Sequence, residues 1–447
     1  MGMEDFIREE IIENYLNPLS QNGLLKKRIN AEEGIRSRED GEFQRDYTRI
    51  MYSSSFRRLQ GKMQLFGIKS DQFFRNRLTH SLEVAQIARS IATIIGYPQD
   101  EIYIVEAGAL AHDIGNPPFG HAGERYLNEI SKDFGGFEGN AQTLRILTTV
   151  EKKRANFRGL NLTYRTLFSV VKYFNQFNAK LSGDDYNEQK FLYNDDFEIL
   201  DNIANDTRLL TRTLDVQIVD LADEIAYAAH DLEDGLRQRI FTTDELAHDF
   251  HSMYGSCDAY GALLDILQKS KDRASHGQTN MDSSEFSKLY RKELTSKIIN
   301  VLIHDISLIE VTDEQREKTA TRQSKELGFK NLGHLAKGLK KTTFNCINHN
   351  DEVYSYEQRG KRIIESLYNF YLKENKYLPP EYRAQNVNLQ YNFGFNPEKD
   401  NEGKFKNKNM FNLQRRLIVD YISGMMDDFA ISTYEKYDLK NIIGVNR

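Results

Sequence analysis

The distribution of proline is the feature that most constrains how this chain can fold. Seven prolines occur in 447 residues, and none lies between Pro118 and Pro379. Because proline lacks a backbone N–H and breaks a helix interior, a stretch of this length without it is open to continuous helices. Apolar residues recur at three- and four-residue steps, whereas the alternation typical of strands is scarce. The sequence therefore predicts an all-α protein.

Three segments carry the clearest helical pattern. The first runs from Ser81 to Ile95 and stops at Gly96-Tyr97-Pro98, an ending typical of a helix C-terminus. A second helix is expected from near Asp100 to the break at 115–118, and a third over residues 213–236. The buried face of the first helix is expected to consist of Leu82, Ala85, Ala88, Ile91 and Ile95.

We expect the chain to divide into an N-terminal segment (1–39), a core (40–236) and a C-terminal helical region (237–447) that packs on this core. Residues 180–185 and 275–280 combine Gly, Ser, Asn and Asp, which is typical of surface turns. Residues 396–409 are rich in Lys, Glu, Asn and Gly, and we expect a mobile loop there.

Composition excludes several classes of protein. Apolar residues make up 39% and charged residues 28%, the balance of a soluble globular protein with a core. No run approaches the ~18 apolar residues of a membrane span, and the acidic N-terminus lacks the pattern of a signal peptide, so a cytoplasmic location is expected. Cys257 and Cys346 form neither a disulfide framework nor a cysteine metal site. The net charge of −6 argues against general coating of nucleic acid, while local basic clusters still suit a polyanionic small substrate.

A histidine on an apolar helix face is the first candidate for chemistry. The dipeptide His-Asp occurs four times, at 112, 230, 248 and 304, and most of these pairs are expected at solvated helix positions. His112 differs because it continues the inward face of Ile102, Val105 and Ala109, directly before a rigid turn. Such an imidazole is either a hydrogen-bonded core histidine or a metal ligand, and position alone favours the core histidine.

Two further segments add residues that suit a metal. His80 begins the helix preceding that of His112, and Asp223 lies in a stripe with Asp220, Tyr227 and Asp231. This stripe is either the wet face of an amphipathic helix or a row of side chains that looks into a cleft. Together, two imidazoles and two carboxylates suit Mn²⁺, Fe²⁺, Co²⁺, Ni²⁺, Zn²⁺ or Mg²⁺, and such a site can generate hydroxide near neutral pH. The four residues are His80, His112, Asp113 and Asp223.

The assembled motifs resemble the HD-domain deoxynucleotide triphosphohydrolases, most closely the bacterial dGTP triphosphohydrolases (dGTPases). The most specific stretch is His112-Asp113-Ile114-Gly115-Asn116-Pro117-Pro118-Phe119-Gly120-His121-Ala122-Gly123-Glu124. Residues 45–60, 75–84, 137–142, 220–231 and 420–425 also match, in the family's order. The resemblance implies an HD-domain helical core with additional C-terminal helices, and hydrolysis of a dNTP, dGTP favoured, to deoxynucleoside and tripolyphosphate.

The resemblance also assigns roles to residues. It implies one divalent metal ion per chain, bound by His80, His112, Asp113 and Asp223. His121, which by position alone is typical of an exposed loop histidine, becomes a catalytic residue paired with Glu124 three residues later. Arg77 matches a phosphate-contacting arginine in a segment whose basic residues are Arg57, Arg58, Lys62, Lys69, Arg75 and Arg77. Lys172 and Tyr173 match positions near the phosphates or sugar, and Gln64, Tyr227 and Asp231 match sugar-contacting positions.

Two alternatives remain open. One is an HD phosphohydrolase of a different nucleotide, and the other is a nucleotide-sensing or single-strand-binding scaffold whose hydrolysis is secondary. Members of the family also bind single-stranded DNA, so the resemblance adds it as a second candidate partner. A homo-oligomer, a hexamer or a tetramer, is expected on the same ground.

Overall fold

The computed structural model describes residues 5–31, 40–64, 75–155, 157–181, 183–276, 281–348, 351–386 and 407–439. In order, the helices of the N-terminal half are α1 Asp5–Ile11, α2 Asn17–Ser20, α3 Glu42–Met51, α4 Ser54–Arg58, α5 Arg77–Ile95, α6 Ile102–Ala111, α7 Gly120–Ser131, α8 Gly139–Arg145, α9 Tyr164–Phe168, α10 Gly183–Glu188, α11 Asn194–Thr207 and α12 Leu214–Ala226. They are followed by α13 Leu232–Arg237, α14 Thr243–Tyr254, α15 Asp258–Ser275, α16 Ser283–His304, α17 Asp313–Thr319, α18 Gly333–Asn348, α19 Asp351–Lys373, α20 Asn407–Ser423 and α21 Asp427–Lys436.

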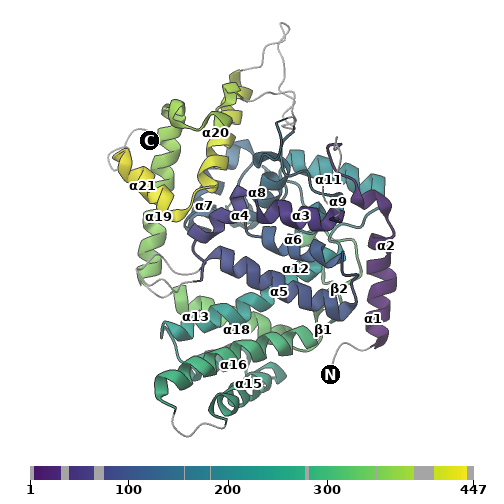
Figure 1. Ribbon diagram of the computed structural model, residues 1–447. Coiled ribbons are helices and arrows are strands. Elements are labelled where there is room, and N and C mark those ends of the chain that lie inside the picture. Colours follow the sequence, from purple (N-terminus) through teal and green to yellow (C-terminus); the bar gives the residue numbers. More distant parts are fainter. Residues whose placement is uncertain are drawn as a thin grey trace.

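The prediction of an all-α protein is confirmed. Among the described residues the one sheet is a hairpin of β1 (Ile306–Glu310) and β2 (Lys325–Phe329), which pair antiparallel with Ile306 opposite Phe329. Helices α5, α6 and α12 pack against one another at the centre of the molecule (Figure 1). None of the described helices is both long enough and apolar enough to cross a membrane.

Local signals explain where α5 begins and ends. The side chain of Asn76 accepts a hydrogen bond from the Thr79 backbone N–H at 2.9 Å, and this caps the N-terminus. Gly96 ends the helix with a φ of 103°, a conformation that costs glycine little. The predicted face was wrong at Leu82, whose side chain is 51% exposed. Leu82 shares the outer line of α5 with Gln86 and Thr93, and Val84 and Ile87 are buried in its place.

The third predicted helix is interrupted by a π-helical turn. Residues 213–236 do form a nearly continuous helical rod, but η6 (Tyr227–Asp231) follows α12 with i→i+5 hydrogen bonding before α13 begins. A π turn holds one residue more than an α turn, so it rotates the side chains that follow it. Tyr227 and Asp231 both lie in η6, which makes this turn part of the site described below.

Two apolar cores organise the chain. The first takes side chains from Ile11 to Leu339, so helices on both sides of residue 236 contribute to it. The second joins α7 to α19, α20 and α21.

The C-terminal helices also hold the loop that precedes α7. Asp427 accepts hydrogen bonds from the backbone N–H of Phe119 at 3.1 Å, from the backbone N–H of Met63 at 3.2 Å and from the Tyr356 hydroxyl at 3.0 Å. The ammonium of Lys62 donates to the backbone carbonyls of Asn116 and Ser423. Loop 116–119 is therefore fixed from the C-terminal side of the chain.

The loop predictions had mixed outcomes. Residues 183–185, expected in a turn, begin the short helix α10, while Ser182 lies outside the described residues. Helix α15 ends at Ser275, as expected, and residues 277–280 are again outside the described part. Of the expected loop 396–409, residues 396–406 are not among those described, and 407–409 open α20.

Candidate metal and nucleotide site

Three central helices bring two histidines and one aspartate together. His80 lies in the first turn of α5, His112 directly follows α6, and Asp223 lies in α12. The Nε2 atom of His80 is 3.0 Å from Oδ1 of Asp223, and Nε2 of His112 is 3.4 Å from the same oxygen. One nitrogen or oxygen atom from each of the three side chains lies within 4.8 Å of the others. This grouping suits a divalent cation.

The hydrogen bonding of His112 tests whether the cluster fits a metal ion. Its Nδ1 lies 2.6 Å from the carbonyl oxygen of Ala109, which can only accept, so Nδ1 carries the proton. The Nε2 lone pair then faces the cluster, where this buried atom has no hydrogen-bond partner. Burial lowers the pKa of His112, but the carboxylates of Asp113 and Asp223 outweigh it and raise the pKa to about 9. A positive charge is thus favoured at Nε2, supplied by a proton when no metal is bound and by a metal ion that takes its place.

Asp113 lies beside this cluster and is held from two sides. Its Oδ1 is 3.6 Å from Nε2 of His112 and also accepts a hydrogen bond from the Asn116 side chain. Its Oδ2 accepts from Nη1 of Arg77 at 2.6 Å. Burial raises the pKa of Asp113, but Arg77 above all lowers it to about 2. Arg77, predicted to contact phosphate, therefore also orients a predicted metal ligand.

His121 and Glu124 form the predicted pair at the start of α7. Phe119 and Gly120 both have positive φ angles, of 63° and 57°, and this turn sets the direction of the helix. Nδ1 of His121 lies 3.2 Å from Oε2 of Glu124, while Oε1 accepts a hydrogen bond from the Gly139 backbone at 2.9 Å. Burial raises the pKa of Glu124, but the hydrogen bond with His121 and the charge of Lys190 lower it to about 2. An ionised Glu124 can orient His121, whose side chain is 66% exposed.

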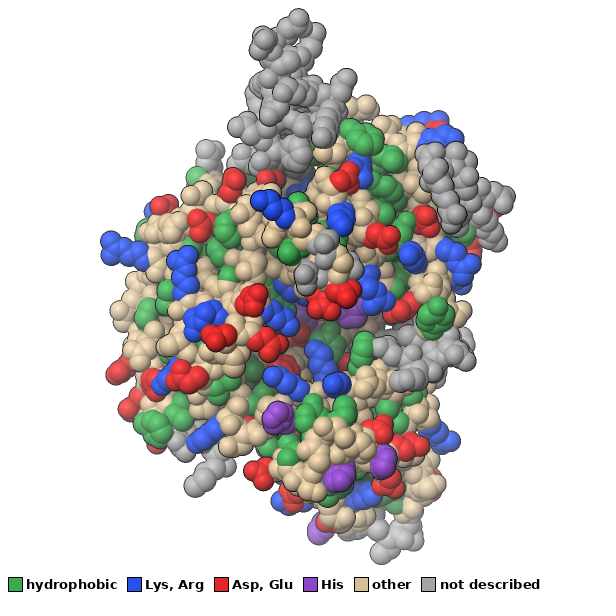
Figure 2. Space-filling model, turned by 180° about the vertical axis from the view of Figure 1, so that it is seen from behind, with side chains coloured by type: hydrophobic (Ala, Val, Ile, Leu, Met, Phe, Trp, Pro, Cys, Tyr) green, Lys and Arg blue, Asp and Glu red, His purple; other side chains and the backbone are tan. Residues whose placement is uncertain are grey.

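A cavity of about 270 Å³ joins the metal cluster and the His121–Glu124 pair. Figure 2 shows, near the middle of one face, a hollow in which basic and histidine side chains are visible. Cationic side chains from four parts of the chain line the cavity, namely Arg77, Lys172, Lys190 and Lys340. Phosphate oxygens are the natural partners of such a group.

The other predicted substrate residues lie at or next to this cavity. Gln64, Tyr227 and Asp231 line it, and buried oxygens of Gln64 and Asp231 have no hydrogen-bond partner. The Tyr227 ring lies 4.9 Å from the His80 ring, measured between centroids. Tyr173 is buried and does not line the cavity, but its ring lies 5.7 Å from the ammonium of Lys172. Among the described basic residues of segment 57–77, Arg77 alone lines the cavity, and Lys69 lies outside the described residues.

Sequence reasoning missed several residues of the cavity. Lys340 comes from α18, beyond the predicted core, and its ammonium lies 4.5 Å from the centre of the Tyr227 ring. Lys190 reaches Glu138 at 2.8 Å from a loop with no recognisable pattern. Asn116 and Asn140 stood inside the matched stretches and could have been selected from them. Of the three remaining His-Asp pairs, His248 and His304 are exposed, in line with the expectation that most pairs are solvated, whereas His230 is buried in η6 with Asp231 and was not selected.

Comparison with known proteins assigns the chain to the HD phosphohydrolases. Residues 77–228 match the HD domain, and residues 330–392 match the phosphohydrolase-associated domain. A deoxyguanosinetriphosphate triphosphohydrolase-like protein 2 of Vibrio cholerae is 42% identical over 92% of both chains. Deoxyguanosinetriphosphate triphosphohydrolase-like proteins of Bartonella quintana and Rickettsia bellii are each 33% identical, over 89% and 94% of this chain and 90% and 96% of their own.

The chain therefore belongs to the family of HD-domain deoxyguanosinetriphosphate triphosphohydrolase-like proteins. The resemblance inferred from its motifs is confirmed.

Proposed function

We propose that this protein hydrolyses deoxynucleoside triphosphates, with dGTP as the favoured substrate, to a deoxynucleoside and tripolyphosphate. The observation that carries the proposal is that one cavity reaches the His80–His112–Asp223 cluster through His112 and Asp223 and is also lined by four cationic side chains and Tyr227, while His80 is buried behind its wall. The names of the relatives support the same chemistry.

One divalent ion would be held by His80, His112 and Asp223, with Asp113 as the fourth ligand. When bound, such an ion supplies Lewis-acid activation of water and of the phosphate at neutral pH. Mg²⁺, Mn²⁺, Fe²⁺, Co²⁺, Ni²⁺ and Zn²⁺ are all compatible with two imidazoles and two carboxylates.

The cations bind and orient the triphosphate. Lys172, Lys190 and Lys340 approach the cavity from three different segments, so they can contact successive phosphates along one chain. Arg77 donates a hydrogen bond to the predicted ligand Asp113, and this proximity to the metal cluster supports a contact with the α-phosphate. In the reaction, water adds to the α-phosphorus, the bond from that phosphorus to O5′ breaks, and a proton passes to O5′. His121, oriented by Glu124, holds or moves a proton at this bond.

The sugar is held on the other side of the cluster. Tyr227 stands one turn beyond Asp223, so its ring can lie beneath C2′ and leave no volume for a hydroxyl. The unpartnered oxygens of Gln64 and Asp231 can bind the 3′-OH. Burial raises the pKa of Asp231 well above its usual value, which allows this carboxyl to donate as well as accept.

A panel of the four dNTPs and GTP tests the proposal. With Mg²⁺ or Mn²⁺ present, chromatography should show tripolyphosphate and deoxynucleoside, fastest from dGTP, and little product from GTP. Release of pyrophosphate, or equal rates on GTP and dGTP, would favour an HD phosphohydrolase of another nucleotide. Binding of oligonucleotides that weakens with salt, without any dNTP turnover, would favour the single-strand-binding scaffold.

Replacing Tyr227 by alanine should admit ribonucleotides. The variant loses the ring that fills the space at C2′, so turnover of GTP should rise while turnover of dGTP falls. A pocket that excludes the 2′-hydroxyl sterically, and leaves polar atoms without hydrogen bonds when GTP binds, can discriminate by more than the ~1–3 kcal/mol that loss of one apolar contact gives. The ratio of kcat/KM for dGTP and GTP measures the change. Tyr227→Phe keeps the ring and should retain the wild-type ratio, and an unchanged ratio in Tyr227→Ala would remove Tyr227 from sugar selection.

A further inference from the structure

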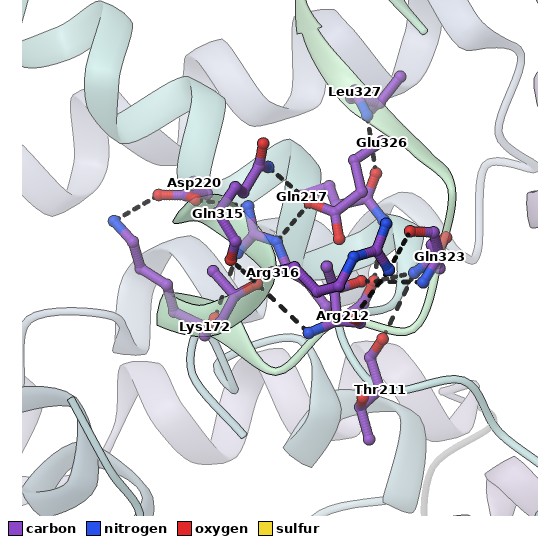
Figure 3. A network of polar contacts seen from close by, with 12 residues as sticks. Lys172, Thr211, Arg212, Gln217, Asp220, Gln315, Arg316, Gln323, Glu326 and Leu327 are labelled. Carbon is purple, nitrogen blue, oxygen red and sulfur yellow. Dashed lines mark hydrogen bonds and ion pairs between the residues drawn. The ribbon is translucent and has the colours of Figure 1, made fainter. Parts of the chain in front are cut away.

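Arg212 is the centre of a polar network outside the cavity (Figure 3). It lies in the short connection between α11 and α12 and has a φ of 63°, which is uncommon for a residue with a side chain. Its guanidinium is almost fully buried, with 6% of the side chain exposed. A buried charge in an unfavourable backbone conformation requires compensating contacts. These come from the segment 306–329, from α12 and from the backbone carbonyl of Lys172.

The hairpin supplies the first set of contacts. Glu326 of β2, which is fully buried, accepts a hydrogen bond from Nε of Arg212 at 2.6 Å and another from Gln315 of α17 at 3.0 Å. The side chain of Gln323 donates to the backbone carbonyl of Arg212 at 2.7 Å. Gln217 of α12 donates to the same carbonyl at 2.8 Å and accepts from the backbone N–H of Leu327 at 2.9 Å. The segment 306–329 thus fixes both the backbone and the side chain of Arg212.

The second set of contacts leads from Arg212 to the cavity. Its Nη2 donates to Oδ2 of Asp220 at 2.8 Å, and its Nη1 donates to the backbone carbonyl of Lys172 at 3.2 Å. The other oxygen of Asp220 pairs with the ammonium of Lys172, which lines the cavity. Asp220 is therefore shared between a buried cation and a cation that faces the substrate.

The segment 306–329 also holds the backbone that follows Lys172. The backbone N–H of Phe174 donates to the carbonyl of Thr319 at 3.1 Å, and the side chain of Asn175 donates to the carbonyl of Lys318 at 2.7 Å. Both acceptors stand at the end of α17. The position of Lys172 thus depends on a part of the chain that contributes no side chain to the cavity.

We propose that Arg212 and Glu326 are positioning residues that make Lys172 available to the triphosphate. This role rests on the proposed function of the cavity. Without Arg212, Asp220 would have Lys172 as its one cationic partner within contact distance among the described residues, and a phosphate would have to compete for that ammonium. With Arg212 in place, Asp220 keeps a buried counter-charge when Lys172 turns to an anionic ligand. Less free energy is therefore needed to move the Lys172 ammonium from Asp220 to the ligand. Glu326 holds the guanidinium of Arg212 in the orientation in which it contacts Asp220.

Glu326→Gln and Arg212→Gln test the proposal, with Glu310→Gln as the matched control. Glu310 lies on the same hairpin but is exposed. We expect each test variant to raise KM for dGTP by about tenfold, a change of about 1.4 kcal/mol, with a smaller change in kcat. Calorimetry in excess Mn²⁺ should show a similar weakening for tripolyphosphate, while deoxyguanosine binds as in the wild type. Glu310→Gln should behave as the wild type in all of these measurements.

A double-mutant cycle separates positioning from general destabilisation. In a Lys172→Met background, Glu326→Gln should have almost no further effect on tripolyphosphate binding, because the residue through which it acts is gone. The same tenfold loss in both backgrounds, or equal losses for tripolyphosphate and deoxyguanosine, would overturn the proposal. Glu326→Gln keeps this test available if Arg212→Gln does not fold. If wild-type protein binds tripolyphosphate but hydrolyses no dNTP, the proposed function is refuted, and the double-mutant cycle still tests the positioning role of Arg212 and Glu326. If wild-type protein does not bind tripolyphosphate, the proposed function and the positioning role are both overturned.

Discussion

Replacement of His112 or Asp223 by alanine is expected to remove the metal ion and abolish turnover. Each substitution deletes an atom of the cluster in which the donor atoms lie within 4.8 Å of one another. The lost atom is the buried, unpartnered Nε2 in the case of His112. In the case of Asp223 it is the carboxylate oxygen that faces both histidines. Elemental analysis after dialysis measures the metal content, and the dGTP assay measures turnover.

His248→Ala is the matched control for this experiment. His248 also precedes an aspartate but is exposed on α14, so its loss should leave both metal content and turnover unchanged. Full metal occupancy in the double variant of His112 and Asp223 would count decisively against these ligands.

His121→Ala should retain the metal ion and lose about 10²- to 10⁴-fold in turnover, the usual scale for a positioned acid or base. The exposed imidazole lines the cavity, 3.2 Å from Glu124, and does not belong to the His80–His112–Asp223 cluster. Metal analysis and single-turnover rates with dGTP separate a chemical defect from a loss of metal. His304→Ala, which removes an exposed histidine from α16, serves as the control. A rate near that of the wild type would make His121 a surface residue without a catalytic role.

Helix ends and buried helix faces were predicted most accurately from the sequence where the local pattern and the tertiary structure agree. The capping type of Asn76, the Gly-Tyr-Pro ending of α5 and the apolar face that leads to His112 act within one or two helical turns, and the folded chain retains them. The same reasoning failed at Leu82, because helical spacing places an apolar stripe only to within about one residue.

Other parts of the site had no local signal. Lys190 and Lys340 lie in polar segments like many others, and only the packing of α18 against η6 brings Lys340 to Tyr227. The π turn at 227–231 could not be seen in the pattern, because one additional residue in a turn hardly alters helical periodicity. The ion pair of Arg77 with Asp113 joins residues 36 positions apart, and it adds contact with a predicted metal ligand to the phosphate contact predicted for Arg77.

The late position of two hydrogen-bond acceptors, the Asp427 carboxylate for Phe119 and the Ser423 carbonyl for Lys62, has a consequence for protein synthesis. All side chains of the cavity lie at or before Phe344, about 80 residues upstream of Asp427. At translation rates of 5–20 residues per second, the interval between the two is about 4 to 16 s. During this interval the nascent chain contains all the predicted metal ligands and the lysines of the cavity. It does not yet contain Asp427 and Ser423, which accept the hydrogen bonds of Phe119 and Lys62. A ribosome-bound chain is thus expected to stay inactive until this late segment has emerged and docked.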